Sequence, residues 1–261
     1  MARRKSAGVR NRTGSIGIKN ETALHAALKT HYAQMPLAMT EIKLEGYVID
    51  VVTPDCLIEI QTSSLYAMKK KLAALLPNHH VCVVYPLVTK VAVSYVDEST
   101  GEITGTGRGR GKSDAYLFDQ LVGLRDFLGH PHFTLEVVSV TVEELRIKDG
   151  KGSWRRKGVS IVDRKLTAIL ETRTFVSKTD YLELLPPLPA GAFTNTRLAR
   201  ECNMNDTYAG RVTYCLFYIG VLHKRKKTKG NGWEFCLGDF PKAVEAEAVT
   251  PVRKIRKQLV K

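Results

Sequence analysis

Residues 46–62, GYVIDVVTPDCLIEIQT, constrain the fold more than any other segment, because two short apolar runs flank Pro54-Asp55. Proline suits the first central position of a β-turn. The segment therefore predicts an antiparallel hairpin with strands over 47–52 and 56–61. The run Leu57–Ile60 is nearly continuous in apolar residues, which is typical of a strand that is covered on both faces.

The same hairpin sets two acids opposite one another. Pairing across the turn brings Asp50 to Glu59, and successive side chains of a strand alternate between its faces. Like charges directly opposite each other destabilise a sheet, and a fold tolerates them most readily around a cation. Carboxylates select hard metals such as Mg²⁺ or Mn²⁺; the alternative is a solvated sheet face. We expect one face to carry Ile49, Val51, Ile58 and Ile60, and the other to carry Asp50, Glu59 and Gln61.

The flanking pattern predicts a helix on each side of the hairpin. Asn20 is a suitable helix N-cap, and Glu21 falls in the first turn, where the helix dipole favours an anion. Pro36 ends this helix. The other elements that we expect are a helix over 64–76, strands over 81–85 and 90–95, a basic loop over 101–111, a helix over 114–128, a strand over 134–140 and a strand pair within 143–174.

An acid in a first helix, an Asp near a strand end and a Glu-x-Gln in the next strand resemble the PD-(D/E)xK nuclease superfamily. The resemblance covers roughly residues 19–95 and includes the element order, and the helix acid is similar to that of Holliday-junction-resolvase-type members. It implies an α/β fold, a restriction-endonuclease-like mixed sheet flanked by helices. It also implies metal-assisted phosphodiester hydrolysis, with Mg²⁺ or Mn²⁺ held by Asp50, Glu59 and Glu21.

The chain departs from the family pattern at Gln61, where the family has a lysine. An amide cannot carry positive charge beside an attacking water, so Gln61 would orient the water or ligate through its carbonyl. Some family members supply the lysine from the following helix, where Lys70 or Lys71 is placed to reach back. The alternative for these lysines is a solvated helix face. The literal Pro54-Asp55 falls in the turn, and we therefore prefer Asp50.

A second unit is expected over residues 176–239, after the nuclease-like domain 20–175. We expect three helical segments, over 178–185, 194–201 and from 205 or 206 to 219, with Thr194 as the N-cap of the second and Asn205 or Asp206 as that of the third. Three helices followed by a basic hairpin are the order of a winged helix-turn-helix. One face of the third helix and the hairpin carry side chains suited to phosphates and base edges. The alternative is a protein–protein module that uses the same helix only structurally. The expected DNA-binding residues are Thr207, Arg211, Tyr214, Lys224, Arg225, Lys226, Lys227 and Lys229.

Charge favours a nucleic-acid partner, because 40 Lys and Arg against 26 Asp and Glu give a formal net charge of +14. Residues 1–19 form a flexible basic arm and residues 240–261 a basic tail in this interpretation, although basic termini can also be solvated tails without a target. No run approaches the roughly 18 apolar residues of a membrane span, and we expect no membrane association. No secretory signal is recognisable, and five scattered cysteines without a CxxC fit a reducing cytoplasm.

These observations together predict a metal-dependent DNA endonuclease with a tethered DNA-binding domain, acting in repair, recombination, or restriction and defence. The alternative is a non-catalytic DNA-binding protein or regulator on a degenerate nuclease scaffold. A lysine amine at the Asp50–Glu59 face would distinguish the two. A third interpretation is an RNA-binding or RNA-processing protein. Cutting both strands of DNA would suit a homodimer.

Overall fold

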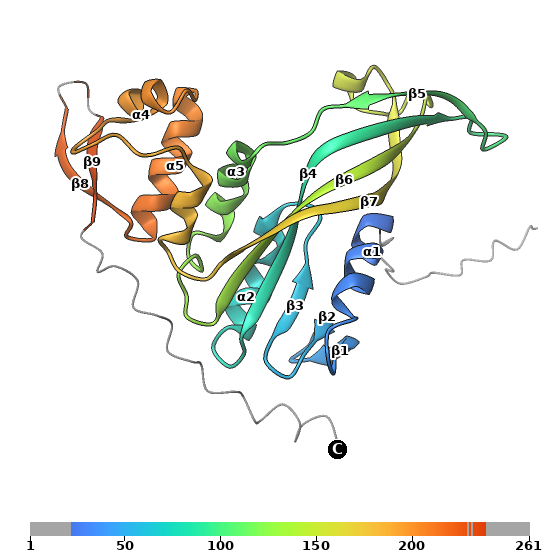
Figure 1. The fold of residues 1–261 in the computed structure, drawn as a ribbon, viewed down its shortest axis with the longest axis horizontal. Coiled ribbons are helices and arrows are strands. Elements are labelled where there is room, and N and C mark those ends of the chain that lie inside the picture. Colours follow the sequence, from blue (N-terminus) through green and yellow to red (C-terminus); the bar gives the residue numbers. More distant parts are fainter. Residues whose placement is uncertain (1–21, 229, 231, 239–261) are drawn as a thin grey trace, which may run out of the picture.

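The computed structural model describes residues 22–228, 230 and 232–238. A seven-stranded mixed sheet, flanked by helices, forms its centre (Figure 1). The strand order is β1-β2-β3-β4-β6-β7, and β5 pairs with β4 off this path. The expected α/β class, a mixed sheet with helices on its faces, is confirmed. The strands are β1 (Met39–Leu44), β2 (Tyr47–Val52), β3 (Leu57–Ile60), β4 (Val81–Val96), β5 (Ile103–Gly109), β6 (Phe133–Ile147) and β7 (Ser160–Phe175).

Two helices cover opposite faces of the sheet. Helix α1 (Ala23–Tyr32) buries Leu24 and Leu28 in one core, which also holds alternate residues of β3 and β4 such as Ile58 and Val84. Helix α2 (Lys69–Leu75) buries Leu72 in a second core against the intervening residues of the same strands. Both faces of β3 are therefore covered, and all four of its residues are buried.

The hairpin of β2 and β3 agrees with its prediction near the turn, but the register does not include the predicted pair of Asp50 and Glu59. The strands are antiparallel, with Val51 opposite Ile58 and Val52 opposite Leu57. The turn closes through Thr53 N–H, which donates to Cys56 O at 2.9 Å. Strand β3 then runs parallel to β4, with α2 between them in the chain.

The alternation predicted for β2 is wrong at Ile49. The common face predicted for Asp50 and Glu59 is also wrong, because Asp50 contacts His25 of α1 whereas Glu59 pairs with Lys71 of α2 on the opposite face. Strand β1 pairs Thr40 with Val51 and then Ile42 with Ile49, and no pair joins Glu41 to Asp50. Glu41 has a positive φ of 56°, which an ordinary pleat cannot contain. Ile49 consequently packs in the α2-side core, whereas Val51, Ile58 and Ile60 pack in the α1-side core.

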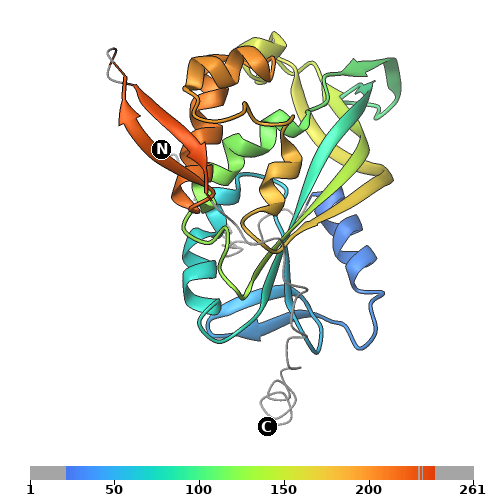
Figure 2. The same cartoon turned by 60° about the vertical axis from the view of Figure 1, so that its left-hand side comes forward.

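Strands β4, β6 and β7 are much longer than expected, at 16, 15 and 16 residues. The sequence predicts two strands around Pro86, but β4 continues through it, with a register shift between Val88 and Lys90. The expected basic loop over 101–111 contains strand β5 instead. The far halves of these strands form an arm that projects from the body of the sheet (Figure 2).

The expected helix over 114–128 is divided into shorter pieces. A 3-10 turn, Asp114–Tyr116, precedes α3 (Leu117–Leu121), and a second 3-10 turn, Val122–Leu124, follows it. A Cβ at Gly123 would lie 3.1 Å from the backbone of Tyr66, so this turn packs closely on the segment before α2. The α3 segment forms a bridge between the sheet and the C-terminal part of the chain.

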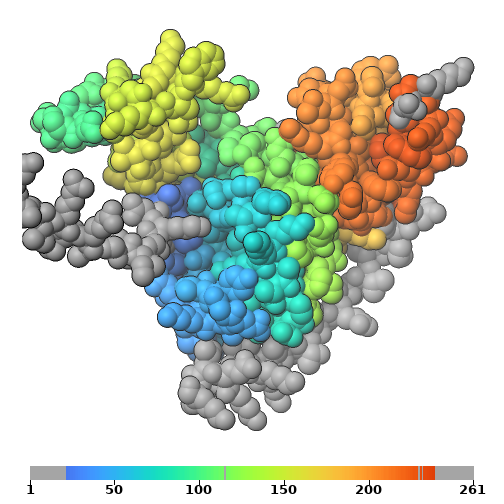
Figure 3. Space-filling view, turned by 180° about the vertical axis from the view of Figure 1, so that it is seen from behind, coloured from blue at the N-terminus to red at the C-terminus, as the bar shows by residue number. Residues whose placement is uncertain are grey.

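The C-terminal part contains α4 (Asn195–Glu201), α5 (Asp206–Tyr218) and a hairpin of β8 (Leu222–Lys227) and β9 (Trp233–Leu237). Thr194 and Asn205 cap the two helices with their side chains, as the sequence predicts. The first expected helix of this part is a 3-10 turn, Asp180–Leu184. Seen from behind, the C-terminal part and the arm stand on either side of a notch (Figure 3). Within the described ranges, no helix is long and apolar enough to cross a membrane.

Candidate active site

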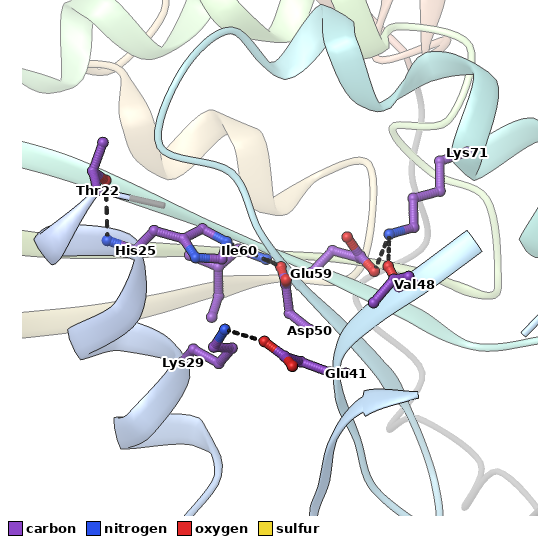
Figure 4. A network of polar contacts seen from close by, with 9 residues as sticks. All are labelled: Thr22, His25, Lys29, Glu41, Val48, Asp50, Glu59, Ile60 and Lys71. Atoms are coloured by element: carbon purple, nitrogen blue, oxygen red, sulfur yellow. Dashed lines mark hydrogen bonds and ion pairs between the residues drawn. The ribbon is translucent and has the colours of Figure 1, made fainter. Parts of the chain in front are cut away.

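Asp50, at the irregular position of β2, is directed toward α1 (Figure 4). Its Oδ2 lies 3.2 Å from His25 Nε2 and accepts a hydrogen bond of 2.8 Å from the backbone N–H of Ile60. Burial alone would raise the pKa of Asp50, but the hydrogen bonds from His25 and Ile60 outweigh it and hold the pKa below its ordinary value. Asp50 is therefore ionised at neutral pH and fixed in orientation.

Glu59, in the middle of β3, is the most deeply buried of the predicted acids, with 4% of its surface exposed. Its Oε1 lies 2.5 Å from Lys71 Nζ. This ion pair lacks hydrogen-bond geometry, and Oε1 has no hydrogen-bond donor among the described residues. Burial raises the pKa of Glu59 to about 7, Lys71 opposes the rise, and the nearby charge of Asp50 adds to it. The carboxyl group thus titrates near neutral pH.

Lys71 is the one of the two predicted lysines that lies against Glu59. It extends from α2 to the end of the hairpin, where Nζ also donates to Val48 O at 2.6 Å. Its side chain is 15% exposed, because Leu72 and Leu75 of the same helix pack into the core and bring this part of α2 against β2 and β3. The Lys71 amine therefore links α2 to both strands of the hairpin, β2 and β3.

The other predicted site residues lie elsewhere. The amide of Gln61 donates to Ser64 O at 2.9 Å, which ties down the segment after β3. Lys70 is exposed. Helix α1 begins at Ala23 with Thr22 as its N-cap and has no acid in its first turn, so the predictions of Asn20 as the N-cap and of an acid in the first turn are wrong. Glu21 lies outside the described residues. Within residues 22–228 and the described part of the last hairpin, no three His, Cys, Asp or Glu side chains gather as a metal-binding group.

His25 is the site residue that sequence reasoning missed. It lies in the first turn of α1 and contacts Asp50 of β2. Its position three residues after the N-cap Thr22 gave no chemical signal, because the contact depends on the irregularity of β2. A histidine one turn into a helix becomes informative only when the partner strand is known.

The predicted DNA-binding residues are divided between two environments. Thr207 is exposed near the start of α5, whereas Arg211 makes a 2.5 Å ion pair with Asp119 of α3. Tyr214 lies beside Arg125, just beyond α3. The face of α5 predicted to read bases therefore lies partly against α3. The basic run Lys224–Lys227 is exposed on β8, and Lys229 lies outside the described residues.

The chain belongs to a family described as a domain of unknown function, DUF8091, whose model matches residues 22–176. The match covers more than half of the chain and ends beside the last residue of β7. The chain is also 34% identical over 177 residues to an uncharacterized protein of Treponema pallidum (strain Nichols). That alignment spans 67% of this chain and 70% of the relative. No solved structure matches the chain.

Replacing Lys71 with methionine should destabilise the fold. The change leaves the buried Glu59 carboxyl group without its counter-charge, and breaking a buried pair in this way typically costs about 3 kcal/mol. We expect a decrease of that size in the free energy of unfolding, measured by urea denaturation. The control is Lys70→Met on the exposed side of the same helix, which should change stability by less than about 0.5 kcal/mol.

A second replacement checks the origin of this loss. Adding Glu59→Gln to Lys71→Met removes the isolated acid, and the double variant should recover much of the lost stability. Equal losses in Lys71→Met and Lys70→Met would show that the ion pair contributes nothing.

The raised pKa of Glu59 predicts a pH dependence of stability. The folded protein binds this proton up to about pH 7, whereas an ordinary glutamate releases it near 4.5. The contribution of protonated Glu59 to the free energy of unfolding is therefore fully present below pH 4.5 and decreases as the pH rises toward 7. In metal-free buffer, the free energy of unfolding of the wild type should decrease over this interval relative to Glu59→Gln. Parallel curves for the two proteins would contradict the assignment.

Proposed function

We propose that the protein is a metal-dependent DNA endonuclease with a DNA-binding C-terminal part. The observation that carries the proposal is the position of Lys71, whose amine lies 2.5 Å from Glu59. The sequence leaves open whether any lysine reaches the acidic site from the helix after Gln61. A buried, paired amine at that place supports catalysis over a site that has lost its lysine.

The order of elements supports the same proposal. Helix α1, strands β1 to β3, helix α2 and strand β4 follow one another as the resemblance to PD-(D/E)xK nucleases implies, with Asp50 on β2 and Glu59 on β3. Helix α2 crosses one face of the sheet between the parallel strands β3 and β4. Lys71 of α2 would thus take the role of the lysine that the nuclease family has at the position of Gln61.

Two carboxylates are the ligands that a divalent cation of the magnesium class would use. Mg²⁺ is usually held by one or two carboxylates and retains several waters; here Asp50 is ionised, and Glu59 would bind the ion after leaving its ion pair with Lys71. Asp50 and Glu59 would hold Mg²⁺ or Mn²⁺, with Glu21 as a further acid outside the described residues. The ion would polarise a phosphoryl oxygen and lower the pKa of a bound water.

The protein's own groups would act around this centre. His25 and the Ile60 N–H hold Asp50 in one orientation. Lys71, on release from Glu59, would stabilise negative charge that develops on the phosphate. The charge of Lys71 is already close to both acids, since it lowers the pKa of Asp50 as well as that of Glu59.

The C-terminal part supports a DNA-binding role through its helices and its basic hairpin. We propose a winged helix-turn-helix-like unit in which α5 and the hairpin contact DNA. The exposed basic residues of β8 supply affinity that depends on salt and not on sequence. Repair, recombination and restriction or defence are all compatible settings for such an enzyme.

The second candidate is a DNA-binding protein without catalysis. It is favoured by Gln61, and by the contacts of the Lys71 amine with Glu59 and Val48 O, which hold the amine within the protein. The nuclease proposal requires this contact to open when substrate and metal bind.

Cleavage assays distinguish the two candidates. We expect wild-type protein to cut DNA in a mixture of supercoiled, linear and branched substrates with Mg²⁺ or Mn²⁺, and EDTA to abolish cutting. Glu59→Gln and Lys71→Met should each lower the rate by about 100-fold or more while leaving DNA binding intact. Lys70→Met tests the other predicted lysine, and because that side chain is exposed it should cut at the wild-type rate.

The absence of cleavage would also distinguish the two candidates. Wild-type protein that binds every DNA substrate at low salt and cuts none of them would establish the DNA-binding candidate. Cleavage by Lys71→Met at the wild-type rate would show that Lys71 has no role in catalysis, even if the protein is a nuclease.

A further inference from the structure

A continuous row of cations and aromatic rings crosses the C-terminal part, and we propose that it binds single-stranded nucleic acid by stacking unpaired bases. We define this cation–aromatic ladder by its members on the segment after α3, on α5 and on the last hairpin. The proposal rests on the proposed nucleic-acid function and names the form of nucleic acid that this surface would bind. The ladder consists of Arg125, Tyr214, Tyr218, Phe217, Lys224, Trp233 and Lys227.

The first part of the ladder joins α5 to the segment after α3. The guanidinium of Arg125 lies 5.4 Å from the ring centre of Tyr214 and 4.8 Å from that of Tyr218. The two tyrosine rings, one helical turn apart, have centres 4.7 Å from each other. A cation and two rings thus form a compact group at one end of the surface.

The second part joins α5 to the hairpin. The rings of Phe217 and Tyr218 have centres 6.2 Å apart. Lys224 Nζ lies 4.2 Å from the ring centre of Phe217 and 5.0 Å from that of Trp233. Lys227 Nζ lies 5.5 Å from the Trp233 ring on the other side of the hairpin. Every neighbouring pair along the ladder is therefore in contact, across three separate elements.

Three of the four rings of the ladder are exposed to water. Tyr218 is 52% exposed, Trp233 37% and Tyr214 36%. The opposite side of α5 is buried in the core through residues such as Val212 and Leu216, and Phe217 packs partly against the same core, so the two exposed tyrosines are not needed to attach the helix. Exposed rings of this size, gathered on one surface, mark an interaction site.

The chemistry of the ladder matches a flexible polyanion that carries flat rings. Aromatic side chains stack on bases of any sequence, and neighbouring cations pair with the phosphates between them. The exposed Arg225 and Lys226 on β8 add positive charge beside the ladder, although Lys226 is within 3.7 Å of Glu234. Each base stacked on an aromatic ring contributes about 1–3 kcal/mol.

The packing of α5 favours unpaired bases over a duplex groove. A helix that enters the major groove has to present an open face. Here Arg211 is paired with Asp119 of α3, and the ring of Tyr208 packs edge-on against Phe118 of α3 at 6.0 Å. The surface that remains open is the one formed by α5 and the hairpin, where the exposed rings of the ladder lie beside the exposed cations of β8.

Tryptophan fluorescence of the full chain tests the proposal. The chain has two tryptophans, so Trp154→Phe leaves Trp233 as the sole reporter. In EDTA, which keeps the test independent of cleavage, we titrate this protein with oligothymidylate, oligouridylate and a blunt duplex of equal charge. We expect single strands to quench Trp233 and to bind at least tenfold more tightly than the duplex, and a preference between thymidylate and uridylate identifies DNA or RNA as the better ligand.

Substitutions in the same background isolate stacking from charge. Tyr218→Ala should weaken oligothymidylate binding about tenfold, whereas Tyr218→Phe, which retains the ring, should bind as the parent does. The matched control is Tyr66→Ala, which removes a 65% exposed tyrosine that has no cation contact among the described residues.

Two results would overturn the inference. In one, Tyr218→Ala and Tyr66→Ala bind oligothymidylate equally well. In the other, the duplex or polyglutamate quenches Trp233 as strongly as the single strands do, which would reduce the surface to a general anion or duplex site. Because cleavage is not measured, a failed nuclease proposal and a failed ladder proposal give different results.

Discussion

An ionisable side chain in a strand buried on both faces is the constraint to which the rest of the architecture responds. Glu59 lies between α1-side and α2-side cores, where an unpaired carboxylate would be costly. Lys71 compensates from α2, and its second contact, with Val48 O, joins the same helix to β2. The positions of the helix and of both strands of the hairpin are thus linked through one charge pair. A fold built only for stability would place an apolar side chain at this position.

The two acids of the hairpin are held in different ways, and this difference supports a chemical role. Asp50 is fixed in its charged form by donors, whereas Glu59 is held near the midpoint of its titration at neutral pH. Groups with separated pKa values in one small region are typical of active sites. Both acids lie within the segment that the family model matches.

The sequence predicted the hairpin, the helix after it and the two capped C-terminal helices, because apolar periodicity, prolines and capping residues act locally. It did not predict the irregular pairing of β1 with β2 at Asp50, because no residue pattern around Glu41 indicates a left-handed backbone conformation. Pro86 suggested a strand end, yet β4 continues through it. Lys71 could be chosen over Lys70 only from the structure, because both lie within reach by spacing alone. His25 and the ion pair of Arg211 are long-range contacts, which local patterns do not encode.

The α2-side core continues past the sheet, through Phe118 of α3 and into Tyr208 and Leu216 of α5. The family match, in contrast, ends at residue 176, before α5 begins. A protein that carried the family segment alone would leave one side of α3 uncovered. In this chain the cover comes from α5, whose Tyr208 packs against Phe118. The family segment and α5 therefore share one hydrophobic core, which neither of them completes alone.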